Sequence, residues 1–235
     1  MAQAQTKPID LYFWPTPNGF KITIMLEELG VPYAVKYINI SKGDQFAPDF
    51  LAISPNNRMP AIVDPEGPEG QPISVFESAA ILMYLGRKFG QFYPTDERKR
   101  VEVEEWLMWQ MGGVGPMFGQ NNHFRNYAPE KLPYAIRRYE DEAHRLYGVL
   151  NKRLAGREFV AGEYSIADMA LVGWMRIHER QGIDIDEFPE VKRWLDALHA
   201  RPAVDRGLTV GADVRTTDLG SDKDAQSVLF NQRSR

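Results

Sequence analysis

The stretch IDLYFWPTPNGFKITIMLEELG, residues 9–30, decides how the first part of the chain folds. Residues 9–14 are apolar and rich in strand-forming types, and a proline ends the run, which predicts a buried strand. Thr16 suits the N-cap of a helix, and Pro17 suits its first position. Apolar residues then recur at helical spacing as far as Gly30, a residue type that commonly follows a helix end. The stretch therefore predicts a strand that turns directly into a helix.

The residues that follow extend this unit into a small α/β domain. Residues 33–40 alternate like a second strand, so a parallel pair with a right-handed crossover is expected. The turn PEGPEGQP, residues 65–72, separates two short apolar runs and predicts a hairpin. The order βαβ–α–ββα indicates a compact α/β domain, with its later elements at residues 46–53, 61–64, 73–76 and 77–89.

From residue 91 onward the chain shows only helical patterns, which predict an all-α bundle. Ser165 and Asp168, in the string SIAD, have the spacing of a capping box, and this explains Asp168 better than a role as a catalytic acid. The residues from about 210 are polar and lack periodicity, so an extended or disordered tail is expected. The expected helices lie at about 97–121, 130–154, 166–181 and 190–200, and the expected domains at 1–91 and 97–210, followed by the tail at 211–235.

The composition excludes several functions. The chain has 235 residues, a net charge of −4 and no cysteine, so it offers no electrostatic case for binding nucleic acid and no disulfide, thiolate metal site or thiol nucleophile. Its four histidines show no metal-ligand spacing, and no metal is expected. The first eight residues, MAQAQTKP, do not resemble a signal peptide, and no apolar run approaches the roughly 18 residues of a membrane span. We therefore expect a soluble, cytoplasmic protein.

The turn after the first strand is a candidate site for an anion. A helix N-terminus exposes unpaired N–H groups and the positive end of the helix dipole, so an anion there, including a thiolate, is stabilised. The nearest side chains are those of Thr16 and Asn18. The alternative is that Thr16 only caps the helix and Asn18 only faces water. The turn contains no Cys, Ser or His, so a nucleophile would have to come from elsewhere.

Two dipeptides next to the later strands are further candidates. If the Met59–Pro60 bond is cis, the backbone groups of Met59 can pair with an extended peptide; a trans proline at the start of an edge strand is the commoner alternative. Ser78 and the first N–H groups of its helix could bind a carboxylate, while Glu77 pairs with an ammonium. Together they would hold an α-amino-acid head group. The alternative is that Glu77 only complements the helix dipole.

The segment WQMGGVGPMFGQNNHF, residues 109–124, should kink or break its helix, because it contains four glycines and Pro116. It is not a phosphate loop, since no strand precedes it and no GK[ST] follows it. Its end could wall a cleft, or it could be a simple helix end with a hydrogen-bonded histidine. The residues concerned are Phe118, Gln120, Asn121, Asn122, His123 and Phe124.

In combination these pieces resemble the glutathione S-transferase superfamily over roughly residues 9–205. The strings PTPNG, SPNNRMPAIVD, FESAAILMYL, GPMFGQNNHF, PYAIRRY and NKRL are similar to those of nu-class bacterial glutathione transferases. That class is noted for disulfide-bond reductase activity and is related to the yeast nitrogen-regulatory prion protein. The resemblance implies a thioredoxin-like N-terminal domain with a mixed four-stranded sheet, an all-α C-terminal domain and a homodimer.

The resemblance also implies roles for single residues. Many members of the superfamily use a Tyr, Ser or Cys at the first strand–helix junction, but Tyr12 lies in the expected strand and is not assigned that role. Thr16 and Asn18 would lie near the glutathione sulfur. The other implied glutathione-binding residues are Gln45, Met59, cis Pro60, Glu77, Ser78 and Arg138, and the implied second-substrate pocket contains Phe118, Gln120, His123 and Phe124.

The function expected from this resemblance is glutathione-dependent reduction of small disulfides. The glutathione thiolate itself would attack, and a second glutathione could resolve the mixed disulfide in the same cleft. One alternative is conjugation of glutathione to electrophiles, or reduction of organic peroxides, by the same residues. Another is a non-catalytic, glutathione-binding regulatory protein like the yeast prion relative, although only eight residues, with no Gln/Asn-rich extension, precede the first expected strand.

Overall fold

The computed structural model describes residues 5–214, 222–230 and 232. The chain forms two compact units, of which one comprises residues 1–89 with 206–235 and the other residues 90–205. Among the described residues, no helix is both long enough and apolar enough to cross a membrane.

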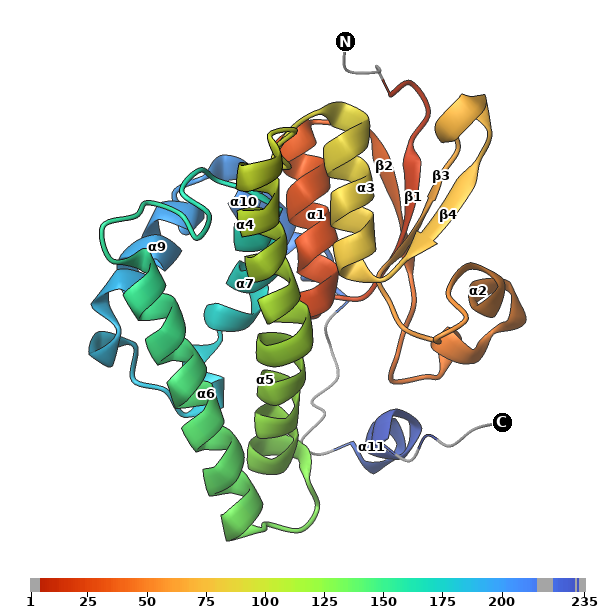
Figure 1. The fold of residues 1–235 in the computed structure, drawn as a ribbon. Coiled ribbons are helices and arrows are strands. Elements are labelled where there is room, and N and C mark those ends of the chain that lie inside the picture. The colour runs from red at the N-terminus through yellow and green to blue at the C-terminus, as the bar shows by residue number, and fades with distance from the viewer. Residues whose placement is uncertain (1–4, 215–221, 231, 233–235) are drawn as a thin grey trace. The chain divides into compact units, whose positions relative to one another are not determined.

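The first unit contains a mixed four-stranded sheet with the strand order β2-β1-β3-β4. β1 pairs in parallel with β2, and β3 pairs antiparallel with both β1 and β4, so the expected parallel pair and hairpin are confirmed. Figure 1 shows α1 and α3 side by side along one face of this sheet. The bounds are β1 Ile9–Phe13, α1 Pro17–Leu29, β2 Tyr33–Tyr37, α2 Pro48–Ile53, β3 Ala61–Asp64, β4 Ile73–Phe76 and α3 Ser78–Phe89.

The strand register brings three chain segments to one edge of the sheet. Tyr12 near the end of β1 pairs with Ala61 at the start of β3, and Ala61 pairs with Phe76 at the end of β4. α1 begins four residues after β1 ends, and α3 begins two residues after β4 ends. The N-termini of both helices therefore lie at the same edge of the sheet.

The ends of α1 match their prediction. Thr16 is the N-cap and accepts a hydrogen bond from the Gly19 N–H, Pro17 occupies the first turn, and Gly30 ends the helix in a left-handed conformation. Burial of α1 is greater than one apolar stripe would give, because residues 19–26 are all buried.

Part of this burial comes from α10 (Pro202–Thr209), which approaches α1 at the level of the backbone. The Thr23 hydroxyl donates to the Gly207 carbonyl at 2.7 Å. A methyl group on Gly207 would lie 2.7 Å from the Ile24 nitrogen, so only glycine permits this approach.

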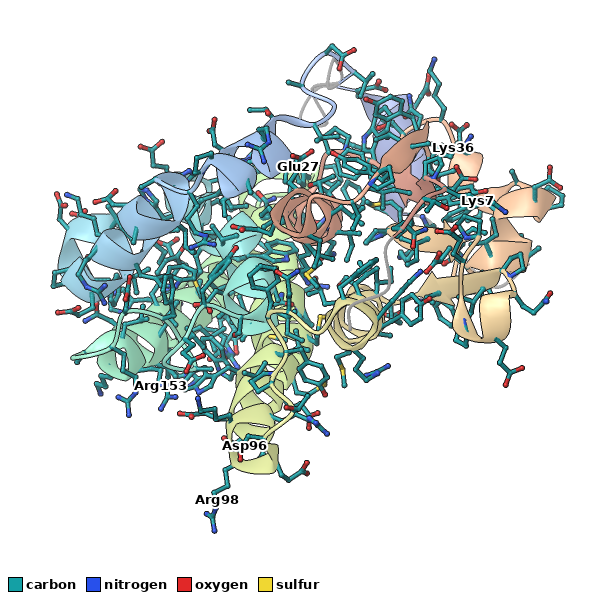
Figure 2. The ribbon with its side chains drawn as sticks, turned by 90° about the horizontal axis from the view of Figure 1, so that it is seen from above. Lys7, Glu27, Lys36, Asp96, Arg98 and Arg153 are labelled. Atoms are coloured by element: carbon teal, nitrogen blue, oxygen red, sulfur yellow. The ribbon has the colours of Figure 1, made fainter. Side chains whose placement is uncertain are left out.

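The second unit is helical, as expected, with Asp96 as the N-cap of its first helix, α4. Figure 2 labels Asp96 at that end, and its carboxylate accepts from the Lys99 N–H at 3.0 Å. The bounds are α4 Glu97–Trp109, α5 Gly115–Asn122, α6 Pro133–Leu154, α7 Ile166–Met175, α8 His178–Gln181 and α9 Pro189–His199.

The glycine-rich segment interrupts the regular α-helix where a kink or break was expected, but the chain stays helical through the interruption. A π-helical turn at Gln110–Val114 joins α4 to α5, and a second one at His123–Tyr127 follows α5. Pro116 lies in the first turn of α5, directly after the first π-helical turn. The wider turns therefore accommodate the glycines and Pro116 while the backbone remains helical.

The capping box at the start of α7 is present as predicted. Asp168 is fully buried and accepts hydrogen bonds from the Ser165 N–H at 3.0 Å, the Val160 N–H at 3.0 Å and Trp194 Nε1 at 2.9 Å. The carboxylate therefore joins three segments of the helical unit, which supports a structural role.

The expectation of an extended or disordered tail is wrong for α11, Lys223–Phe230. Asp222 caps this helix by accepting from the Ala225 N–H at 2.9 Å, and Ala225 itself is buried. Arg58 Nη1 also donates to Gln232 Oε1 at 2.7 Å, so the segment contacts the loop before β3. Residues 215–221, 231 and 233–235 of the expected tail lie outside the described residues.

Candidate active site

The start of α1 and the loop before β3 meet at the edge of the sheet where the helices begin. Thr16 Oγ1 accepts from the Gly19 N–H at 3.3 Å and lies 3.5 Å from Met59 Sδ. Gly19 is needed for this close turn, because a methyl group there would lie 2.4 Å from the Trp14 carbonyl oxygen. The half-buried Thr16 and Asn18 thus stand at a helix N-terminus beside Met59.

The Met59–Pro60 peptide bond is cis, as the resemblance implied and contrary to the commoner geometry of such bonds. Met59 packs against a small apolar cluster that includes Phe50 of α2. Tyr12 packs against the same cluster, with its ring centroid 5.9 Å from that of Phe50. Tyr12 therefore belongs to the packing between β1 and α2.

Glu77 and Ser78 form the turn from β4 into α3. Glu77 has a φ of +68°, a left-handed conformation that is uncommon outside glycine, and its carbonyl accepts from the Ile81 N–H at 3.0 Å. Its exposed carboxylate lies 3.4 Å from Asn56 Nδ2. Ser78 is the first residue of α3 and is only 4% exposed. The turn therefore presents a carboxylate and the first N–H groups of a helix together, which suits an amino-acid head group.

A buried lysine beneath this turn is a residue that sequence reasoning missed. Lys21 of α1 is 1% exposed, and its Nζ lies 3.3 Å from Ser78 Oγ. Burial lowers the pKa of Lys21 to about 7, and the charge of Glu77 opposes that shift. No local pattern signals this burial, because a lysine in a helix is expected to reach solvent.

Gln45 lies in the loop between β2 and α2, and its side chain is buried. Its Nε2 donates to the Ile40 carbonyl at 3.1 Å. Its Oε1 is also buried and has no hydrogen-bond donor among the described residues. This oxygen is therefore a buried acceptor that no donor among the described residues satisfies.

The expected second-substrate residues belong to the helical unit. Gln120 is exposed on α5, and the half-buried His123 contacts the Phe124 ring edge to face. Desolvation, followed by the nearby charge of Lys131, lowers the pKa of His123, so the neutral imidazole is favoured. Arg138 is exposed on α6.

Phe118 differs from its expected place in a pocket wall. Its side chain is fully buried and stacks on Tyr147, with ring centroids 5.3 Å apart and an angle of 12° between the rings. A second aromatic neighbour is Trp174, with the ring centroids 6.5 Å apart. These contacts give Phe118 a packing role under α5.

Within the part of the chain that the structure describes, no group of three or more His, Asp or Glu residues could hold a metal ion.

Both units match domains of known proteins. Residues 7–87 match the glutathione S-transferase N-terminal domain, and residues 123–202 match the C-terminal domain. The chain is 51% identical over 202 residues to the disulfide-bond oxidoreductase YfcG of Escherichia coli (strain K12), covering 85% of this chain and 94% of that protein.

Two solved structures are similarly close. A glutathione transferase family member from Pseudomonas fluorescens, with two glutathione molecules bound, has 50% identity and a TM-score of 0.81, covering 85% of this chain and 92% of that one. A glutathione transferase from Pseudomonas putida, with one glutathione disulfide bound per subunit, has 45% identity and a TM-score of 0.83, covering 86% and 91%. Because both domain models match and the chain is 51% identical to a relative that it covers almost completely, the chain belongs to the glutathione S-transferase superfamily.

Proposed function

We propose that this protein is a glutathione-dependent disulfide-bond reductase that acts on small disulfides and uses the thiolate of glutathione as its nucleophile. The observation that carries the proposal is the capped N-terminus of α1 beside Met59, in a chain without cysteine. Such a site stabilises an anionic sulfur but offers no sulfur of its own.

Glutathione would lie along the edge of the sheet where α1 and α3 begin. Its sulfur would be near Thr16 and Asn18, and its cysteinyl unit would pair with the Met59 backbone beside Pro60. Its γ-glutamyl end would meet Glu77 and Ser78. We assign Gln45 and Arg138 to the remaining polar groups of the ligand. The unused acceptor on Gln45 supports its assignment, because a ligand N–H would satisfy a buried oxygen.

The site needs no catalytic base to form the thiolate. A free thiol has a pKa near about 8.5, and lowering it by one unit takes about 1.4 kcal/mol. A helix N-terminus contributes about 0.3–1 kcal/mol, and a hydrogen bond to a charged acceptor contributes about 1.5–3 kcal/mol. One donor from Thr16 or Asn18, added to the helix dipole of α1, is therefore sufficient.

The reaction proceeds by two thiol–disulfide exchanges. The first glutathione thiolate attacks one sulfur of the disulfide RSSR, forming a mixed disulfide and releasing RS⁻. A second thiolate attacks the glutathione sulfur of that mixed disulfide, giving oxidised glutathione and a second RS⁻. The two thiolates leave with the two protons that the glutathione thiols lost. The relatives with two glutathione molecules, or with one glutathione disulfide, support a site that takes both.

The segment that contains Gln120, His123 and Phe124 is our proposed wall for the disulfide substrate. Gln120 is exposed and His123 and Phe124 are half-buried, whereas Phe118 is fully buried and is left out of this wall. A neutral His123 would not attract the leaving thiolate, so the wall would act by shape and hydrogen bonding.

We further propose a homodimer in the cytoplasm.

The test is turnover of bis-hydroxyethyl disulfide at saturating glutathione, compared with conjugation of chlorodinitrobenzene. We expect the disulfide to be the better substrate and the double variant Thr16→Ala/Asn18→Ala to lose most of that activity. Thr209→Ala, which changes an exposed threonine of α10 in the same unit, is the control and should keep full activity. No turnover by the wild type, or full turnover by the double variant, would refute the proposal. Tight glutathione binding without turnover would favour a regulatory protein instead.

A further inference from the structure

The C-terminal segment (residues 210–214, 222–230 and 232) lies against parts of the first unit that lead to the proposed glutathione site. It follows the residues that match the C-terminal domain of the family, which end at residue 202. The function proposed above gives this segment no role. Its contacts nevertheless fall close in sequence to three of the assigned residues.

The first contact lies where β1 ends. A methyl group built on Gly211 would lie 3.2 Å from Phe13 Cε1 and 3.3 Å from Tyr37 Cε1, so the backbone at Gly211 lies close to both rings. Gly211 has a φ of +73°, a conformation that favours glycine. Phe13 is the last residue of β1 and comes three residues before the helix cap Thr16. The C-terminal segment therefore packs on the strand that leads to Thr16.

The second and third contacts are made by α11 and the residues just after it. A methyl group built on Gly43 would lie 3.8 Å from Val228 Cγ1, so Val228 of α11 lies beside the backbone of that loop. Gln232 Oε1 accepts from Arg58 Nη1 at 2.7 Å, and Gln232 Nε2 donates to the Val228 carbonyl at 3.1 Å. The end of α11 therefore contacts both the loop after β2 and the loop before β3.

Both loops carry residues assigned to glutathione. Gly43 comes two residues before Gln45, whose buried Oε1 has no donor among the described residues, and Arg58 comes directly before Met59. Loops that hold a ligand lose conformational freedom on binding, and an element that already fixes them lowers this cost. Ala225 of α11 is only 2% exposed, so the helix is packed against the protein. The position of α11 therefore suits it to preorganise both loops.

We propose that Val228 and Gln232 are positioning residues of the glutathione site, which act through Gly43 and Arg58 to hold the two loops in the conformation that binds glutathione. This inference rests on the function proposed above. It adds to that function a dependence on residues that lie outside both matched domain ranges. Because coupling between two sites is reciprocal, bound glutathione should in turn stabilise the docked α11.

The first test measures, by calorimetry, the affinity of the full-length wild type and three variants for reduced glutathione. Val228→Asp places a charge at the apolar contact with Gly43, and Gln232→Ala removes an acceptor of Arg58. Lys223→Ala changes an exposed side chain in the first turn of the same helix and is the matched control.

We expect Val228→Asp to weaken glutathione binding by about fivefold or more, the lower end of the usual coupling between two sites. Gln232→Ala should weaken it by about threefold, because one exposed hydrogen bond is lost. Lys223→Ala should change it by less than about twofold. If the wild type binds glutathione and Val228→Asp binds it equally well or better, the inference is overturned while the proposed function stands. A wild type that binds no glutathione overturns both.

Hydrogen exchange of the wild type tests the same coupling without any substitution. The amide hydrogens of residues 223–230 exchange when α11 opens. If the state with α11 undocked binds glutathione about fivefold more weakly, saturating glutathione should slow this exchange by about the same factor. In Val228→Asp the exchange should be faster and should no longer respond to glutathione. Exchange in the wild type that glutathione leaves unchanged or accelerates would overturn the inference, because α11 would then be indifferent to the ligand or compete with it.

Discussion

Replacing Lys21 with methionine should change how the stability of the unliganded protein depends on pH. Burial lowers the pKa of Lys21 from 10.5 to about 7 in the folded protein, whereas the unfolded chain keeps the ordinary value. Between these values the unfolded state binds more protons, so the free energy of unfolding rises with pH. The expected slope from this one group is about 1.4 kcal/mol per pH unit above pH 7, and the whole shift corresponds to about 5 kcal/mol.

The assay is urea unfolding of the wild type and of Lys21→Met at pH values between about 7 and 9.5. Titration of all other groups is shared by the two proteins, so the difference between their unfolding free energies isolates Lys21. The free energy of unfolding of the wild type should rise steadily relative to that of the variant as the pH rises through this window. A difference that stays constant with pH would mean that Lys21 titrates alike in the folded and unfolded states, and that its burial does not lower its pKa.

Two further substitutions test the packing that supports the site. Asp168→Ala leaves three buried N–H donors without their acceptor and should lower the free energy of unfolding by about 3–5 kcal/mol in the same urea assay. Asp168→Asn keeps one oxygen and should lower the free energy of unfolding clearly less. Equal losses for the two variants would contradict the capping role of Asp168. Gly19→Ala would place a methyl group 2.4 Å from the Trp14 carbonyl and should cost about 1–3 kcal/mol in thermal unfolding. Its control, Gly112→Ala, has open space and should be neutral or slightly stabilising, so a tolerated Gly19→Ala would refute the close turn.

Local sequence signals predicted the features that depend on neighbouring residues. Thr16, Pro17 and Gly30 marked the ends of α1, and Ser165 with Asp168 marked the start of α7, because caps act within one helical turn. The strand–helix–strand order of residues 9–40 predicted the parallel pair, and the turn at residues 65–72 predicted the hairpin. The family resemblance added the cis bond, which residue types alone do not favour.

The features that the sequence did not predict depend on contacts between distant residues. Lys21 is buried in α1, and part of the burial of α1 comes from contact with Gly207, nearly two hundred residues further along the chain. The helical pattern of α1 alone could not reveal that Lys21 is buried. Phe118 stacks on Tyr147 of another helix, which the segment around Phe118 did not reveal. The N-cap of α11, Asp222, was a local signal that the sequence analysis missed. A helix as short as α11 is stable only when its apolar face packs against the rest of the protein.

In the function proposed above, this protein holds the sulfur of glutathione as a thiolate without a nucleophile of its own. The most direct measurement is the pKa of the thiol of bound glutathione, followed by ultraviolet absorption of the thiolate in the wild type and in Thr16→Ala/Asn18→Ala. We predict that the wild type lowers this pKa by at least about one unit from the free value near 8.5, and that the double variant loses most of this shift. A bound thiol that titrates like free glutathione, or a double variant that shifts it as far as the wild type does, would contradict the account.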